Sequence, residues 1–161
     1  LVATTGWTTD ELSTAMDAST FDPPYDFVTL SIGVNNQYRG RSAEDYRIEF
    51  KVLLERAIEL TGGHAGRVVV VSIPDWGVTR FGRESGRDVA QIAAELDVFN
   101  ATNRDEALRH GAHWADVAPA SRRAGDTAGM LANDGLHPSA KQYSRWLEAI
   151  LPAARAALSS P

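Results

Sequence analysis

The alternation of apolar and polar stretches along the chain predicts several buried strands. Residues 68–73 are apolar at every position except Ser72, and residues 27–32 are mostly apolar. Both runs predict strands, and the uniformly apolar run at 68–73 is typical of a strand that is covered on both faces. A shorter run at 113–117 predicts another strand, and residues 1–3 have the composition of the end of a further one.

Between these runs, apolar residues recur at the three- and four-residue spacing of amphipathic helices. Capping sequences mark the starts of the helices, because Ser, Thr and Asp side chains accept hydrogen bonds from free main-chain N–H groups. Helices are predicted from Thr8 to about Ala18, from Ser42 to about Thr61, from Asp88 to about Arg109, and from Ser139 onwards.

Two of these helices have well-defined apolar faces. Pro152 lies within the last helix, and we expect it to bend or restart that helix because proline has no N–H group. The residues expected to face the core are Tyr46, Phe50, Leu53, Leu54, Ala57 and Ile58 in the second helix, and Tyr143, Trp146, Leu147, Ile150 and Leu151 in the last.

Strands that alternate with helices indicate a three-layer α/β/α fold with a parallel sheet, since crossover helices cover both faces of such a sheet. We treat residues 1–161 as a single domain, because this length is sufficient for one core. Segments 34–41, 74–86 and 119–135 are predicted to be irregular loops. Functional sites of parallel sheets lie beyond the carboxyl ends of the strands, so these loops are the first places to look for chemistry.

Composition and charge narrow the class of partner. A formal net charge of −5 argues against nucleic acid or an anionic membrane surface. No apolar run approaches the roughly 20 residues that cross a membrane. The absence of cysteine removes disulfides, thiolate zinc sites and cysteine nucleophiles. We expect a soluble protein that acts on a small molecule, with a cytoplasmic location favoured over secretion; the oligomeric state is not predicted.

The strongest catalytic signal is the sequence Asp134-Gly135-Leu136-His137-Pro138. Histidine titrates near neutral pH and is the natural general base, and it works best when a carboxylate holds its other ring nitrogen. Gly135 permits a turn, and Pro138 keeps His137 out of helical geometry. Taken alone, the spacing favours a plainer alternative, a surface aspartate beside a histidine near a helix cap.

Two other loops carry hydrogen-bond donors. The sequence Gly-Val-Asn-Asn at 33–36 follows a predicted strand, and the Asn35 amide is a neutral donor suited to a developing oxyanion. Gly6, in a turn before the first helix, can offer its main-chain N–H group. Each sequence alone is more typical of an ordinary turn. Together, three loops at one sheet edge supply two donors and an acid–base pair, which favours a catalytic site.

With these segments in this order, the chain resembles the SGNH (GDSL-type) hydrolases, which cleave esters with a serine nucleophile. The family's four sequence blocks are named for Ser, Gly, Asn and His. Residues 5–7 correspond to the glycine block, 32–36 to the asparagine block and 134–138 to the histidine block. Segments 36–40 and 73–79 are similar to the corresponding segments of a bacterial subgroup of this family. The resemblance implies a flavodoxin-like fold and a Ser-His-Asp triad; His137 is the base, Asp134 orients it, and Gly6 and Asn35 form the oxyanion hole.

The sequence departs from the family pattern at two places. Asn36 stands where an aspartate commonly follows the asparagine of the block. The Gly-Asp-Ser block is absent, so we assign no nucleophile among Ser31, Ser42, Ser72, Ser85, Ser121 and Ser139. We expect the native protein to have roughly 30–45 further N-terminal residues, which add a central strand, the nucleophile turn and a connection. Without that serine, this chain is expected to be inactive.

The resemblance also implies a small-molecule ester substrate, such as a short acyl ester, an acetylated carbohydrate or a lysophospholipid. The candidates for substrate contacts are Trp7, Asn36, Tyr38 and Trp76. By contrast, Trp114 and Trp146 are expected in the core.

Other chemistry receives less support. Arg39, Arg80 and Arg83 lie near the predicted site and are candidates for a polar or anionic substrate group. No metal or organic cofactor is expected, since His110 and His113 lack an obvious third ligand. Two alternative functions remain: acyl transfer to an alcohol or sugar with the same residues, and a non-catalytic carbohydrate-binding or interaction module.

Overall fold

The computed structural model describes residues 1–159 and contains a parallel sheet. Strands β1 (Val28–Leu30), β2 (Val68–Val71) and β3 (His113–Ala115) lie side by side in that order. They are shorter than the predicted runs but fall within them. No helix in this part of the chain is both long enough and apolar enough to cross a membrane.

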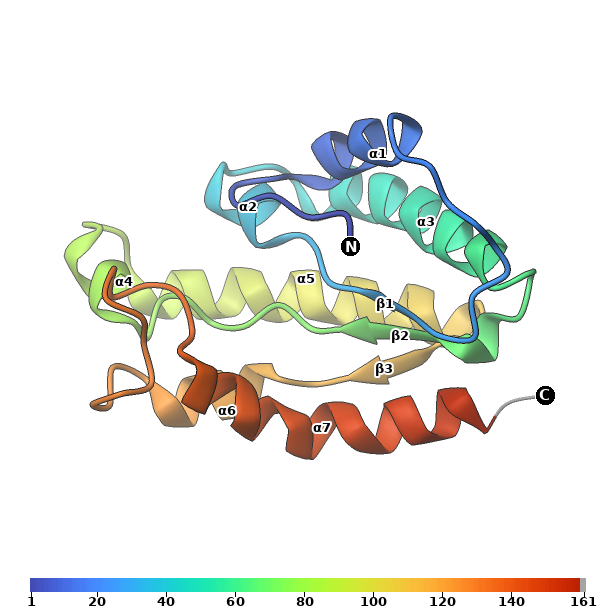
Figure 1. The fold of residues 1–161 in the computed structure, drawn as a ribbon. Helices are drawn as coiled ribbons and strands as arrows, with labels where there is room; N and C mark the ends of the chain where they lie inside the picture. The colour runs from blue at the N-terminus through green and yellow to red at the C-terminus, as the bar shows by residue number, and fades with distance from the viewer. Residues whose placement is uncertain (160–161) are drawn as a thin grey trace.

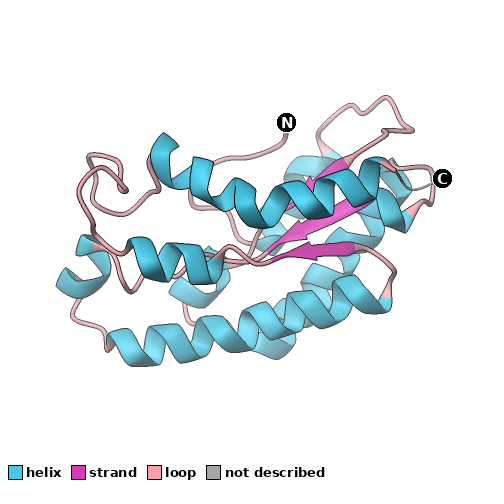
Figure 2. Cartoon of the chain, turned by 90° about the horizontal axis from the view of Figure 1, so that it is seen from below, coloured by secondary structure: helices cyan, strands magenta, loops and turns pink. Residues whose placement is uncertain are grey.

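Helices cover both faces of the sheet (Figures 1 and 2). On one face lie α1 (Thr9–Asp17), α3 (Ala43–Leu60) and α5 (Val89–Arg109). On the other face lie α6 (Ala118–Ala124) and α7 (Ala140–Leu158). The predicted three-layer α/β/α fold with a parallel sheet is therefore confirmed.

β2 is the centre of the molecule. All of its residues are buried, because each face of the strand packs against a different apolar cluster. Val68 and Val70 belong to the cluster that contains α1, α3 and α5, whereas Val69 and Val71 pack with Trp146 of α7. No position of this strand faces water, which explains its uniformly apolar sequence.

The strand expected at the start of the chain is not formed. Residues 1–3 form no strand, and Leu1 is fully exposed. A strand needs a neighbour that satisfies its main-chain hydrogen bonds, and within residues 1–159 β1 pairs only with β2. In addition, Thr29 and Ser31 of the β1 segment are exposed, so this side of the sheet is only partly covered.

The three predicted loops each contain a short helix: α2 (Val34–Tyr38), α4 (Arg80–Glu84) and α6. A 3-10 turn, η1 (Ala65–Arg67), precedes β2. Helices of five to seven residues hold too few apolar positions to show a helical period. α4 begins at a capping residue, because the Thr79 hydroxyl accepts a hydrogen bond from Gly82 N–H at 3.0 Å.

α3 buries the predicted face except for Ile58, which is partly exposed. α7 differs: Trp146 is buried as expected, but the side chains of Tyr143, Leu147 and Leu151 are 53%, 44% and 42% exposed. The apolar stripe of α7 is wider than the surface of β2 and β3 that it covers, so only its centre is buried. The helix also runs on through Pro152, because losing one N–H group does not interrupt its packing on the sheet.

β1 passes into α2 through Gly33, which has a φ of +126°. A Cβ atom at this position would lie 2.6 Å from the Tyr46 ring and 2.8 Å from Ile73 Cδ1. Only glycine combines this backbone conformation with so close an approach to α3 and to the end of β2. Gly33 therefore fixes where α2, and with it Asn35, leaves the sheet.

Replacing Gly33 with alanine should lower the free energy of unfolding by about 3 kcal/mol, because strained backbone and overpacking add. Gly40→Ala is a matched control. Gly40 also has positive φ, +71°, but no atom lies within 4 Å of a built Cβ, so its cost should be about 1 kcal/mol. Urea unfolding measures both; equal costs would show that the contacts with Tyr46 and Ile73 do not matter.

Candidate active site

The segments that follow the strands gather at one end of the molecule. α2, α4 and α6 lie beyond the carboxyl ends of β1, β2 and β3, at the left of Figure 1, together with the loop that leads into α7. This is the edge at which parallel sheets carry their sites. Asn35 and the predicted acid–base pair come from these segments, whereas Gly6 lies in the turn before α1.

Asp134 and His137 form the expected pair. His137 Nδ1 lies 2.6 Å from Asp134 Oδ2, and Asp134 Oδ1 accepts the main-chain N–H groups of Leu136 and His137, each at 2.9 Å. Both side chains are about half exposed. Within residues 1–159, His137 Nε2 has no hydrogen-bond partner, so this nitrogen is free to accept a proton.

These hydrogen bonds also set the charge of the pair. Main-chain donation from Leu136, followed by the contacts with His137, lowers the pKa of Asp134 from 3.8 to about 2. The carboxylate therefore stays ionised wherever an esterase would work. An ionised carboxylate on Nδ1 favours the imidazole form with the proton on that nitrogen, which leaves Nε2 as the base.

The loop that carries the pair is tied down at several points. His137 O accepts from Ala132 N–H at 2.8 Å, and Gly135 O accepts from Phe81 N–H of α4 at 3.1 Å. Gly135 has a φ of +71°, and a Cβ there would lie 2.7 Å from the Arg80 guanidinium. The turn between acid and base is thus set by glycine and supported by α4.

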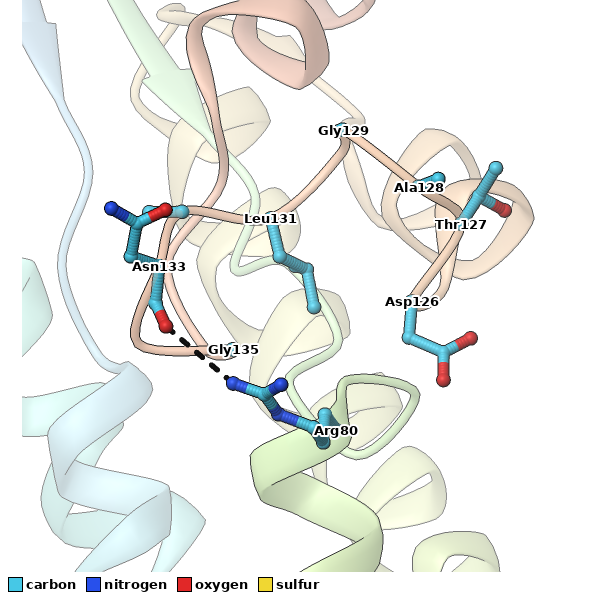
Figure 3. A pocket seen from close by; sticks show the side chains of 9 residues that line it. Arg80, Asp126, Thr127, Ala128, Gly129, Leu131, Asn133 and Gly135 are labelled. Carbon is cyan, nitrogen blue, oxygen red and sulfur yellow. Dashed lines mark hydrogen bonds between the residues drawn. The ribbon is translucent and has the colours of Figure 1, made fainter.

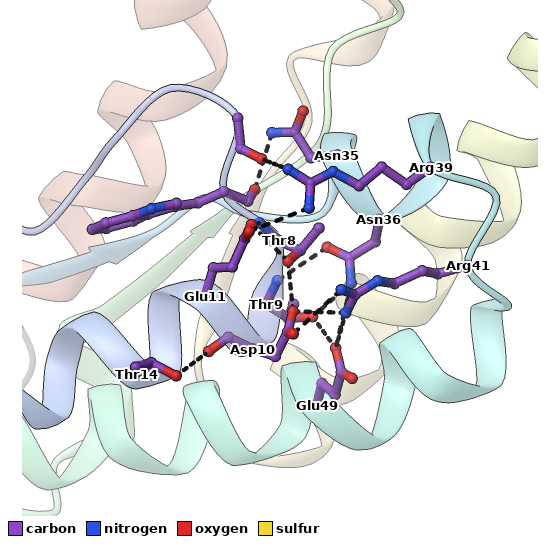
Figure 4. Close-up of polar contacts among 12 residues, drawn as sticks. Thr8, Thr9, Asp10, Glu11, Thr14, Asn35, Asn36, Arg39, Arg41 and Glu49 are labelled. Carbon is purple, nitrogen blue, oxygen red and sulfur yellow. Dashed lines mark hydrogen bonds and ion pairs between the residues drawn. The ribbon is translucent and has the colours of Figure 1, made fainter.

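The two predicted oxyanion donors are brought together by hydrogen bonds (Figure 4). Asn35 Nδ2 donates to Trp7 O at 3.0 Å, which orients the amide and leaves its second N–H available. Arg39 donates to Gly6 O at 2.8 Å and so ties the same turn to the end of α2. In the described part of the chain, Gly6 N–H has no acceptor.

Asn36, a predicted substrate contact, lies instead in the interior. It is 0% exposed; its Oδ1 accepts from Thr9 N–H at 3.1 Å, and its Nδ2 donates to Thr9 Oγ1 at 2.6 Å. Glu49 accepts from the Thr9 hydroxyl and, at 3.4 Å, from Asn36. Asn36 joins α2 to the start of α1 and has no surface with which to touch a ligand.

The aromatic residues expected near the substrate form a bridge between α2 and α4. Tyr38 meets Trp76 edge to face with ring centroids 5.3 Å apart, and both rings lie about 6 Å from Phe81, at 6.2 and 6.1 Å. Trp76 is only 5% exposed and donates to Gln37 Oε1 at 2.7 Å. Of the predicted aromatic contacts, Tyr38, 46% exposed, and the partly exposed Trp7 keep surface for a substrate.

Phe81 and Gln37 were not predicted from the sequence, yet they connect the two halves of the site. Gln37 holds Trp76 and also donates to Glu95 at 2.6 Å. Phe81 stacks near Tyr38 of α2, and its N–H group binds the loop of Asp134 and His137. The Thr79 cap was the only sequence signal that could have placed Phe81 on a helix.

The serines do not supply a nucleophile in this arrangement. Among residues 1–159, no serine hydroxyl lies within hydrogen-bonding distance of His137. Ser42 and Ser139 cap helices as expected. Ser72 is fully buried and donates to Asp116 at 2.9 Å.

Metal ligands do not gather in the described residues: no three His, Asp or Glu side chains are placed to hold an ion. His110 Nδ1 lies 2.8 Å from the main-chain oxygen of Glu106. His113, in β3, has a buried Nε2 without a partner.

The lowered pKa of Asp134 predicts a pH-dependent contribution to stability. A depressed folded-state pKa stabilises the fold above the unfolded value of 3.8, and this contribution is lost as the pH falls towards 2. Asp134→Asn should therefore be less stable than the parent at pH 7, and the difference should narrow between pH 4 and pH 2. Urea unfolding over this range tests it; a pH-independent difference would contradict the assigned hydrogen bonds.

Known structures with the same fold are distantly related in sequence. An α/β hydrolase from the metagenome of Lake Arreo, Spain, is 22% identical with a TM-score of 0.69, over 94% of this chain and 70% of that one. An acetylxylan esterase from Geobacillus stearothermophilus is 17% identical with a TM-score of 0.69, over 92% and 68%. A lipase/acylhydrolase from Enterococcus faecalis is 21% identical with a TM-score of 0.61, over 94% and 71%. These likenesses show the fold.

No curated protein matches the chain in sequence. A family model does match it, over residues 1–145, which include all three motif segments and most of the described elements. On this match the chain belongs to the GDSL-like lipase/acylhydrolase family.

Proposed function

We propose that this chain supplies the general base, its orienting acid and two oxyanion donors of a serine ester hydrolase. The observation that carries the proposal is the 2.6 Å contact between His137 Nδ1 and Asp134, together with the unpartnered Nε2. Membership of an acylhydrolase family agrees with it. The substrate class is a carboxylic ester of small size.

In the proposed reaction, a serine hydroxyl attacks the ester carbonyl carbon while His137 Nε2 takes the hydroxyl proton. Asp134 stabilises the imidazolium that forms. The tetrahedral intermediate collapses, the C–O bond to the alcohol breaks, and His137 returns the proton to the leaving alkoxide. Water, deprotonated by the same nitrogen, then hydrolyses the acyl-enzyme and regenerates the serine.

The oxyanion of both tetrahedral intermediates would be bound by Asn35 Nδ2 and Gly6 N–H. Each of these groups has an unused N–H, and each is held by a second contact that fixes its direction, through Trp7 O and Gly6 O respectively. Preorganised donors of this kind stabilise charge as it develops without reorganising. Asn35 and Gly6 would thus stabilise the oxyanion, while Asp134 and His137 would transfer the proton.

The nucleophile is proposed to be a serine outside these residues, on a turn that follows an additional strand. The described part of β1 uses only one of its two edges, since it pairs with β2 alone, and β1 leads directly into α2 with Asn35. A parallel strand on the other edge would deliver its carboxyl end beside Asn35. Within residues 1–159, no side chain is assigned the role of nucleophile.

Hydrolysis of p-nitrophenyl acetate by the complete gene product tests the assignment of the base. His137→Ala should reduce kcat at least 10³-fold while leaving the fold intact, because triad members act as a unit. His64→Ala is the matched control, since His64 is exposed and lies in the turn before η1, far along the chain from the motif segments. Undiminished turnover by the His137 variant would rule out the assignment.

Asn35→Ala in the same protein should lower kcat by about 10²–10³ and change KM little, since the amide acts on the intermediate more than on the bound ester. A change confined to KM would assign Asn35 to substrate binding instead. Product analysis with an added alcohol separates hydrolysis from acyl transfer: acyl groups that pass to the alcohol in preference to water would identify a transferase.

A further inference from the structure

The three arginines near the site differ sharply in their partners. Arg39 is paired with Glu11 at 3.3 Å and with Gly6 O. Arg83 is paired with Asp126 at 2.7 Å and donates to Val78 O at 2.6 Å. Arg80 has no carboxylate partner within residues 1–159, and its one hydrogen bond, to Asn133 O, is 3.5 Å long.

Arg80 also lines an open cavity of about 320 Å³ between α4 and the loop 126–135. Figure 3 shows its guanidinium directed towards Asn133 and Gly135, with Leu131 above it and Asp126 to one side. Asn133 and Gly135 are the immediate neighbours of Asp134 in the chain. The wall of this cavity is therefore the same loop that holds the acid–base pair.

Two of the lining side chains are charged, and within residues 1–159 Arg80 is the one of them without an ionic partner. Asp126 is the one carboxylate among the lining residues, and its ion pair with Arg83 lowers the pKa of Asp126 and offsets its charge. The Arg80 guanidinium keeps most of its N–H donors unused, because a single long contact engages one of them. An unpaired guanidinium in a polar cavity is suited to binding both oxygens of a carboxylate.

We propose that Arg80 is a specificity residue that binds a carboxylate on the substrate, so that the preferred esters are monoesters of dicarboxylic acids or other esters that carry an anionic group. This inference rests on the proposed function of the neighbouring loop. The open cavity of about 320 Å³ has room for the carboxylate-bearing part of such an ester.

A binding measurement tests this proposal independently of catalysis, because binding needs no nucleophile. Monoethyl succinate carries a free carboxylate where diethyl succinate carries a second, uncharged ethyl ester. Titration of each into the isotope-labelled complete gene product with its nucleophilic serine replaced by alanine, followed by the amide resonance of Gly135 and the Arg80 Nε–H resonance, gives both dissociation constants. The monoester should bind at least tenfold more tightly, and raising the salt concentration should weaken the binding of the monoester alone.

Arg80→Gln should abolish this preference by weakening the monoester at least tenfold while leaving the diester unchanged. Arg83→Gln, which removes a neighbouring but paired arginine, should retain it. Equal affinity of the two esters for the parent chain, an undiminished preference in Arg80→Gln, or an equal loss for both esters would overturn the proposal. The last result would mean that Arg80 supports the loop without recognising charge.

The proposed mechanism and the proposed subsite can be refuted independently of each other. His137→Ala should bind monoethyl succinate as the parent does, since the carboxylate contact does not use the imidazole. Monoester binding that depends on Arg80, combined with hydrolysis that does not depend on His137, would refute the proposed mechanism and keep the subsite. The reverse combination would refute the subsite and keep the mechanism.

Discussion

Burial of β2 on both faces is the constraint from which the geometry of the site follows. Val68 and Val70 pack under the α1, α3 and α5 layer, and Val69 and Val71 pack on α7. Because neither face can be left open, the connections into and out of β2 must cross over as helices, which makes the neighbouring strands parallel. Parallel strands end at one edge, and that edge collects α2, α4 and the loop of Asp134 and His137.

Two kinds of contact hold the candidate site together at this edge. At two positions, glycine lets the main chain approach other residues more closely than a side chain would allow. Gly33 lies against Tyr46 and Ile73, and Gly135 lies against Arg80. The bridge of Tyr38, Trp76 and Phe81 links α2 to α4, and Phe81 holds the loop of Asp134 and His137 through Gly135 O. The proposed oxyanion donor Asn35 and the proposed acid–base pair are thus joined by packing, although they lie far apart in the sequence.

The sequence was a good guide wherever the signal is local. The apolar run of β2, the long amphipathic helices and the Asp134–His137 spacing each depend on residues within a few positions, and the structure agrees with them. The exposed stripe of α7 was mispredicted because apolar character does not reveal how much surface a neighbour covers. Short helices such as α2 escaped prediction because five residues cannot show a period.

Long-range partners account for the remaining differences. Asn36 was predicted to contact the substrate, but its hydrogen bonds run to Thr9, 27 residues away. Trp76 was placed on a loop at the site, and its packing with Phe81 and its bond to Gln37 bury it. Likewise, only the structure distinguishes Arg80 from Arg39 and Arg83, since a sequence does not show which arginine lacks a carboxylate.

The central claim is that Gly6, Asn35 and His137 converge on one reacting group. The most direct measurement is a crystal structure of the complete gene product after reaction with an alkylphosphonate, which mimics the tetrahedral intermediate on a serine. The account predicts that the phosphoryl oxygen lies within hydrogen-bonding distance of Asn35 Nδ2 and Gly6 N, with His137 Nε2 facing the seryl oxygen. An adduct whose phosphoryl oxygen is bound by other groups, or one remote from His137, would contradict it.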